Sequence, residues 1–297
     1  MAFESLEQIV QVCQKKSVSF AEAVILEDQN DRLVTREATM QQMQHIWESM
    51  LEAGRSYDEN RMSTSGLVGG DGGRMARYAE TGNTLCGDRM SRVISQALQM
   101  GESNACMKRI VAAPTAGACG VLPAVLIPLF KESEEKHNAP AETDFVLSLF
   151  VAAGIGQVIA TRASIAGASG GCQAEIGSSS AMAAGALVFL RGGRCDAILQ
   201  AVAMSLKNLL GLVCDPVSGL VEVPCVKRNV IGAVNAMSAA DMALAGIKSA
   251  IPADQVIDAM KEVGDLMDVS LRETGRGGLA ATKRAIEISK KVQNISQ

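Results

Sequence analysis

The sequence predicts a mainly α-helical protein: one Ala/Gly-rich helical domain over residues 1–297, with its functional residues at breaks between helices. Three observations favour this fold. Apolar residues recur at helical spacing, and helix-capping patterns precede several of these runs. The segments after residue 142 are apolar around most of their circumference, which is typical of helices buried inside a bundle. Aromatic residues make up only 3% of the chain, whereas glycine occurs 28 times. We therefore expect closely packed helices with little side-chain bulk between them.

The N-terminal third begins with three predicted helices. Residues 5–8 and 19–22 match the capping box, in which a hydroxyl and a carboxylate or carboxamide bind the free amides at a helix start. Two short helices should follow them. Apolar residues at helical spacing predict a longer helix over 35–53, closed by Gly54. His45 lies in that helix, where a surface or core histidine is a simpler interpretation than a catalytic one.

Two loops combine glycine with hydroxyl groups and are candidate anion sites. Residues 63–73 read STSGLVGGDGG, and residues 114–120 read PTAGACG. Glycines leave backbone amides accessible, so such loops can hold a carboxylate. A flexible linker for the first loop and a packing turn for the second are equally consistent with the composition. The candidate substrate-binding residues are Ser63, Thr64, Ser65, Gly66, Thr115, Ala116 and Gly117.

A charged stretch over 131–140, which contains His137, predicts a solvated connector and a weak subdomain boundary. The helices that follow are expected to form the core of the bundle and its C-terminal end. Their predicted ranges are 142–163, 178–191, 195–211, 229–247, 252–267 and an amphipathic tail over 280–297.

Three of the eight cysteines, Cys172, Cys214 and Cys225, lie at breaks in this helical core, beside glycine or proline. Thiolates at such breaks can point at one shared metal or cluster, although dispersed cysteines alone leave this open. The chain has no C-x-x-C, which excludes ferredoxin and zinc-finger spacings. Three thiolates would leave one iron of a cubane cluster without a protein ligand and able to act as a Lewis acid. Lys227 and Arg228 follow closely and offer positive charge, or simply a solvated basic pair.

Charge and composition limit the partners. The net charge is −4 and is spread along the chain, which argues against a nucleic-acid phosphate backbone as partner. The first 30 residues lack the pattern of a secretion signal, so we expect a cytoplasmic protein with reduced cysteines. Three uncharged runs raise the question of a membrane. The longest, over 110–130, contains three prolines that should break a spanning helix, and we interpret all three as buried core.

The motifs GASGGCQAEIG, CDPVSGLVEVPC and PTAGACG, together with the gaps between the three cysteines, resemble the iron–sulfur-dependent bacterial L-serine dehydratases. The likeness is to the α chain of the two-chain form and covers nearly the whole chain. It implies a helical catalytic domain with cluster-bearing loops and a [4Fe–4S] cluster on Cys172, Cys214 and Cys225. It also implies conversion of L-serine to pyruvate and ammonia, in serine catabolism or gluconeogenesis.

The sequence differs from the single-chain form of that family, which has a fused preceding domain and a C-terminal cysteine on the open iron. Neither is found here, so the resemblance implies a separate β chain. The general base is unidentified. The only histidines, His45 and His137, lie far from the cysteine motifs in sequence, and a residue of the partner chain is one candidate.

Three other functions remain open at this stage. A pyridoxal-phosphate dehydratase performs the same reaction, but no lysine here lies in a convincing Schiff-base setting. A related cluster-dependent L-cysteine desulfidase is closer, because a thiol and a hydroxyl both bind iron. A non-catalytic iron–sulfur sensor or scaffold is the alternative from a different class.

Overall fold

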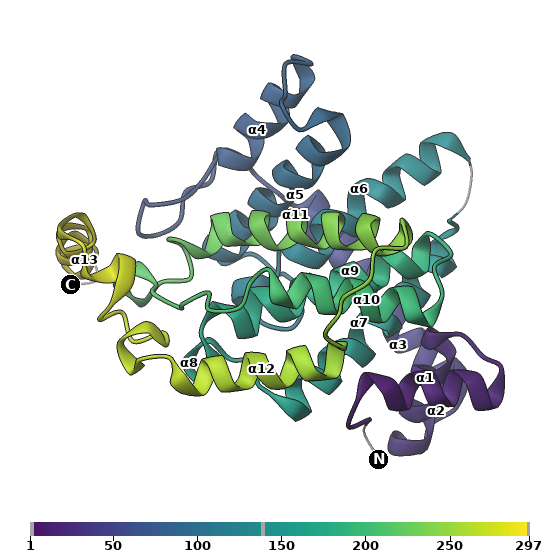
Figure 1. Cartoon of the computed structure of the whole chain (residues 1–297). Helices are drawn as coiled ribbons and strands as arrows, with labels where there is room; N and C mark the ends of the chain where they lie inside the picture. Colours follow the sequence, from purple (N-terminus) through teal and green to yellow (C-terminus); the bar gives the residue numbers. More distant parts are fainter. Residues whose placement is uncertain (1–2, 138–139, 296–297) are drawn as a thin grey trace.

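The computed structural model describes residues 3–137 and 140–295, and these form helices joined by turns and by longer irregular segments such as 56–70 and 106–115 (Figure 1). The described ranges contain no β-strand, which confirms the mainly α prediction; an isolated bridge joins Cys214 to Arg272. The two ends of the chain lie on opposite sides of the molecule (Figure 1). The α-helices are α1 Leu6–Lys16, α2 Phe20–Arg32, α3 Arg36–Arg55, α4 Asp71–Glu80, α5 Gly87–Ala105, α6 Val121–Lys136, α7 Glu142–Arg162, α8 Gly167–Gly170, α9 Ser178–Leu190, α10 Cys195–Lys207, α11 Cys225–Leu244, α12 Ala253–Leu266 and α13 Lys283–Ile295. Shorter helical turns are η1 Ala116–Ala118, η2 Gln173–Gly177, η3 Val217–Gly219, η4 Val269–Leu271 and η5 Gly278–Ala281.

Helix α9 is the centre of the bundle. It packs against α6, α7, α10 and α11, and all but one of its residues are buried. Gly185 shows why small residues are needed there: a Cβ at this position would lie 2.2 Å from Cδ1 of Ile155 in α7. The low aromatic content thus reflects helices that approach each other through alanine and glycine, as the composition predicted.

The N-terminal helices begin where the capping patterns predicted. The Ser5 hydroxyl accepts from the amide of Gln8, and the Ser19 hydroxyl accepts from the amide of Glu22. One prediction here is wrong, because Gly54 does not close α3 but lies inside it. A Cβ at Gly54 would lie 2.8 Å from Cδ1 of Ile127, so this glycine permits close packing on α6 rather than a helix end.

Other helix boundaries also differ from the predictions. Lys131–Lys136 is not a connector but the last part of α6, which continues through Pro128. Residues 138–139 of that predicted connector lie outside the described residues. Gly72 and Gly73 belong to α4 rather than to a loop, and α11 begins at Cys225 instead of residue 229. These helices continue because tertiary packing outweighs local breakers such as glycine and proline.

Two helical stretches, 116–136 and Glu142–Arg162, are long and apolar enough to cross a membrane by length and composition. In each of them 67% of the most apolar window is buried inside the protein. Such burial is what core helices show, and it agrees with the interpretation of these runs as core.

Candidate metal centre

The three predicted metal ligands come from separate elements, and the structure brings two of them, Cys172 and Cys214, together with Glu175. Cys225 lies outside that group, but near enough for the charges of Cys172 and Glu175 to raise its pKa. Cys172 directly precedes η2, a π-helical turn that continues into α9, and Cys225 is the first residue of α11. Cys214 lies in a segment between helices. Its backbone N–H donates to the carbonyl of Leu271, and its carbonyl accepts from the N–H of Glu273. Two of the three cysteines therefore begin helical segments rather than lying in loops. π-Helical turns are often found at functional sites.

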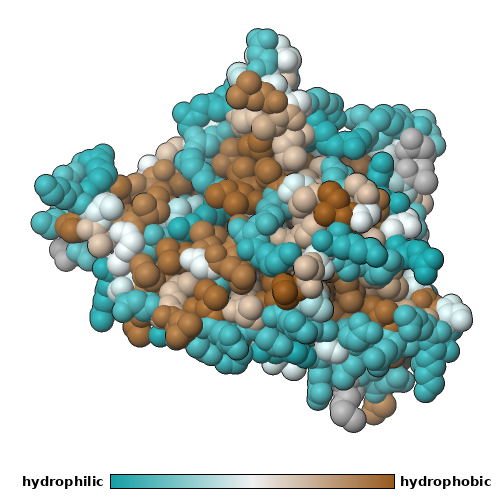
Figure 2. Space-filling model, viewed as in Figure 1, coloured by the Kyte–Doolittle hydropathy of each residue, from teal (hydrophilic) through white to brown (hydrophobic). Residues whose placement is uncertain are grey.

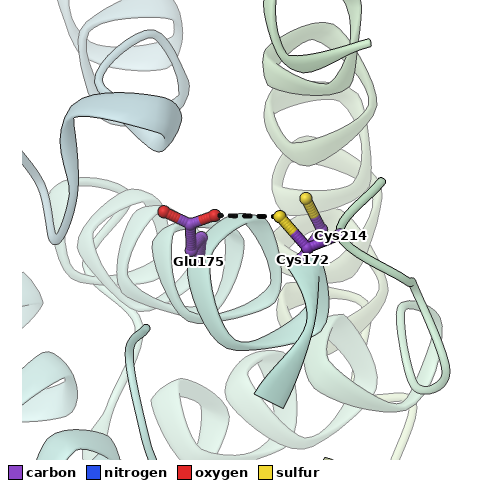
Figure 3. A group of neighbouring side chains, drawn as sticks. All are labelled: Cys172, Glu175 and Cys214. Carbon is purple, nitrogen blue, oxygen red and sulfur yellow. Dashed lines mark hydrogen bonds between the residues drawn. The ribbon is translucent and has the colours of Figure 1, made fainter. Parts of the chain in front are cut away.

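Cys172 and Cys214 meet a carboxylate at the centre of this region (Figure 3). Their sulfur atoms and one oxygen of Glu175 all lie within 4.8 Å of one another, as metal ligands do. The Cys214 thiol donates to Oε2 of Glu175 at 4.0 Å. All three cysteines are buried, whereas Glu175 is partly exposed. Two thiols and a carboxylate form a donor set suited to iron or zinc.

Glu175 was not among the predicted site residues. It lies three positions after Cys172 in the same motif, and this helical spacing places both side chains on one face, a signal that could have identified it. The Thr115 hydroxyl donates to Oε1 of Glu175 at 2.7 Å. One carboxylate oxygen is thereby held, while Oε2 points toward the cysteines.

A notch at Gly167 lies between these ligands. A Cβ on Gly167 would lie 2.7 Å from Oε2 of Glu175, 3.0 Å from Sγ of Cys214 and 3.2 Å from an oxygen of Glu273. Because Gly167 has no side chain, one sulfur and two carboxylates can pack against its backbone at this notch, and a larger residue would displace them. Thiol and carboxylate groups are both common metal ligands.

Arg228 supplies positive charge beside the thiols. Its Nη1 lies 3.4 Å from Sγ of Cys172 and donates to the carbonyl of Val213 at 2.8 Å, while Nη2 pairs with Oδ1 of Asp215 at 2.8 Å. Arg228 is one helical turn after Cys225, so the start of α11 brings both to the site. By contrast, the neighbouring Lys227 is exposed and pairs with Asp71.

The thiols have unequal proton affinities. A side-chain hydrogen bond from Cys214 lowers the pKa of Cys172, and the Arg228 guanidinium lowers it further against the effect of burial. The same contact raises the pKa of Cys214, with burial adding to it. Burial raises the pKa of the Cys225 thiol to about 12, helped by the negative charges of Cys172 and Glu175. A bound metal cation would favour the thiolate at all three positions.

The two loops predicted to bind an anion contact different carboxylates near the cysteines. The loop of Thr115, Ala116 and Gly117 lies directly at Glu175, since a Cβ on Gly117 would be 3.3 Å from Oε1. The first loop contacts Glu222 instead: the hydroxyls of Ser63 and Ser65 donate to its Oε2 at 3.0 and 2.5 Å. Thr64 and Gly66, at the tip of that loop, are exposed. Ser63 and Ser65 are thus linked to the site through the segment that precedes Cys225.

The two histidines lie elsewhere. His45 is on the exposed face of α3 and is 4.0 Å from Glu48, and His137 ends α6 with a left-handed backbone conformation. Neither belongs to the residues that surround the cysteines.

Comparisons with known proteins place the chain among enzymes. Residues 15–280 match the family model described as "Serine dehydratase alpha chain". The chain is 46% identical to the "Probable L-serine dehydratase, alpha chain" of Bacillus subtilis over 290 residues, which covers 98% of this chain and 95% of the relative. It is 40% identical to the "L-serine dehydratase, alpha chain" of Peptoniphilus asaccharolyticus over 285 residues, covering 95% of each.

A similar segment is also found within a longer relative. The chain is 35% identical to the "L-serine dehydratase" of Helicobacter pylori over 285 residues, which is 94% of this chain but only 62% of that protein. The family model and the first two relatives span almost all of this chain, and the range matched by the model contains this chain's three cysteines and Glu175. The chain therefore belongs to the serine dehydratase α-chain family.

Proposed function

We propose that this chain is the α chain of an iron–sulfur L-serine ammonia-lyase, which converts L-serine to pyruvate and ammonia in the cytoplasm as a step of serine catabolism that can supply gluconeogenesis. The observation that carries the proposal is the convergence of Cys172, Cys214 and Glu175 in a chain of this family. Relatives of nearly the same length bear the name L-serine dehydratase.

Cys172, Cys214 and Cys225 are the residues we assign as ligands of a [4Fe–4S] cluster. The donor set fits such a group: thiolates are the usual ligands of iron–sulfur clusters, and Arg228 beside Cys172 offsets their negative charge. The lack of a side chain at Gly167 lets the sulfur of Cys214 and the carboxylate of Glu175 lie close to the backbone there. When bound, the cluster would supply a Lewis-acidic iron without a cysteine ligand, and hydroxide, a poor leaving group, needs such assistance.

The residues around the cysteines would bind and orient serine. Glu175, whose Oε2 is not engaged by Thr115, would hold the substrate ammonium group through a charge-assisted hydrogen bond. The backbone amides of Ala116 and Gly117, on the other side of Glu175, would receive the carboxylate. The other predicted loop would border the site through Glu222 and contribute less to substrate binding, because two of its hydroxyls already donate to that carboxylate. Its residues are Ser63, Thr64, Ser65 and Gly66.

A β chain would complete the enzyme. The names of the relatives designate an α chain, and the H. pylori relative is considerably longer than this one. Exposed apolar side chains lie on the segments next to the cysteines, namely Val221, Val269 and Leu279. Figure 2 shows hydrophobic surface on this side of the molecule, between α13 and the front of α11 and α12. Such a patch is typical of a protein interface, and we place the general base on the chain that covers it.

The decisive experiment is anaerobic purification of the chain with its β chain, followed by iron and acid-labile sulfide analysis and by assays with serine and cysteine. We expect about four irons and four sulfides per α chain, pyruvate from L-serine, and far slower turnover by the α chain alone. Sulfide release from L-cysteine with no serine turnover would make the enzyme a desulfidase. A full cluster without any turnover would favour a sensor or scaffold, and full activity without iron would overturn the cluster.

A further inference from the structure

A second pair of cysteines meets outside the metal centre, between α1 and α10. Cys13 lies on the buried face of α1, where it is 6% exposed, and Cys195 is the partly exposed first residue of α10. Both side chains line the same surface cleft, and the two thiols are close enough for each to shift the pKa of the other. Helices α1 and α10 are in direct contact, so the packing of two segments distant in sequence holds the sulfurs together.

The pair is open to small molecules from one side. Both cysteines line a surface cleft of about 610 Å³, which is bordered by Val10 and Gln14 of α1 and by Phe189 and Arg194 before α10. Cys195 is the more accessible of the two thiols, while Cys13 lies behind it against the core. A reagent entering the cleft would meet Cys195 first.

The two thiols also differ in proton affinity. The hydrogen bond from Cys13 lowers the pKa of Cys195, assisted by a backbone N–H and by Arg194, against the effects of burial and of Asp196. The same hydrogen bond raises the pKa of Cys13, and burial raises it further. Cys195 is also partly exposed and lies at the N-terminal end of α10, where a thiolate is favoured, so it is the nucleophilic thiol, whereas the buried Cys13 retains its proton.

We propose that Cys13 and Cys195 form a thiol–disulfide exchange site that reacts with a low-molecular-weight disulfide of the glutathione class. The Cys195 thiolate attacks one sulfur of that disulfide, a mixed disulfide forms, and the first small thiolate leaves. Cys13 then loses its proton and attacks the sulfur of Cys195, which releases the second small thiolate. Two protein thiols are oxidised to one disulfide while the small disulfide is reduced to two thiols. The product links α1 covalently to α10.

The experiment uses the purified chain pair with its metal centre intact, kept anaerobic so that the only oxidant is oxidised glutathione. Non-reducing peptide mapping by mass spectrometry should find the Cys13 peptide joined to the Cys195 peptide, lighter by two hydrogen atoms than the two separate peptides. A reducing agent should restore both thiols. Absence of this cross-link in the wild type, or a reaction that stops at a glutathione adduct, would overturn the proposal.

Two variants test the order of the steps. Cys13→Ser should stop at a stable glutathione adduct on Cys195, whereas Cys195→Ser should leave Cys13 unmodified for at least tenfold longer than the wild type needs to form the cross-link. Cys86→Ser, which changes an exposed cysteine outside the cleft, should still form the disulfide at the wild-type rate. Equal adduct formation on Cys13 in Cys195→Ser would reject Cys195 as the attacking thiol. The iron content is followed in parallel, so failure of the metal centre is seen separately.

Discussion

The chain contains two pairs of interacting cysteines, Cys172–Cys214 and Cys13–Cys195, with very different surroundings. In each pair a hydrogen bond lowers the pKa of one thiol and raises that of the other. Around Cys172 and Cys214 lie the carboxylate of Glu175 and the Arg228–Asp215 ion pair, and the buried Cys225 is near enough for Cys172 to raise its pKa. Around Cys13 and Cys195 the charged groups are on the surface: the side chain of Arg194 is 93% exposed and that of Asp196 79% exposed.

This difference separates two kinds of thiol chemistry. Several ligands that converge on one buried point, with a guanidinium to balance their charge, favour a bound metal. Cys13 and Cys195 lie at the edge of an open cleft, and among the described residues no third metal-ligating side chain is grouped with them. Such a pair favours reaction of the two thiols with each other. The role of a cysteine pair is therefore determined by the neighbouring ligands and charges and not by the contact between the two thiols.

The largest expected effect separates the two pairs directly. Cys172→Ser, Cys214→Ser and Cys225→Ser should each lose nearly all bound iron and all serine turnover, because a serine hydroxyl is a poor substitute for a thiolate at iron. Cys195→Ser is the matched control and should retain both. Anaerobic iron and sulfide analysis with a pyruvate assay measures the outcome. A complete cluster in any of the first three variants would remove that cysteine from the ligand set.

The second prediction compares the arginine beside each pair. Arg228→Met leaves Asp215, 3% exposed, without its cation, so the free energy of unfolding should fall by roughly 3–5 kcal/mol. Arg194→Met removes an exposed charge 4.0 Å from Asp196 and should change the free energy of unfolding by less than about 0.5 kcal/mol. Anaerobic urea unfolding measures both. Adding Asp215→Asn to Arg228→Met should recover part of the loss, and no recovery would show that Arg228 acts mainly by packing.

The smallest effect concerns the notch at the metal centre. Gly167→Ala places a methyl group among Cys214, Glu175 and Glu273, and iron affinity should fall roughly tenfold with the fold intact. Gly177→Ala, in the same region, is the control, since its nearest neighbours would lie 3.9 Å from the new Cβ. Iron retention during titration with a chelator, together with circular dichroism, checks both. Equal retention would mean that the notch is not part of the metal site.

Much of the fold could be predicted because its determinants are local. The capping hydroxyls of Ser5 and Ser19, and the apolar periodicity of α3, depend on residues within a few turns of each other. The predictions failed at Gly54, at Pro128 and at the starts of α4 and α11, where contacts from distant helices stabilise a continuous helix. Glu175 was missed although its helical spacing to Cys172 was visible in the sequence, because its contact with Cys214 depends on a segment 39 residues further along the chain.

The helical class, most of the helix starts and the three cysteines whose spacing resembles that of a known family could be read directly from the amino-acid sequence. Only the tertiary structure decided which groups surround them. Glu273 packs against Gly167, and Cys13 meets Cys195, from elements far apart in the chain, and the start of α11 turns Arg228 back toward Asp215. Propensity and capping act over one or two turns, so they fix where a helix begins, whereas the packing of α9 among its neighbours fixes which distant side chains meet.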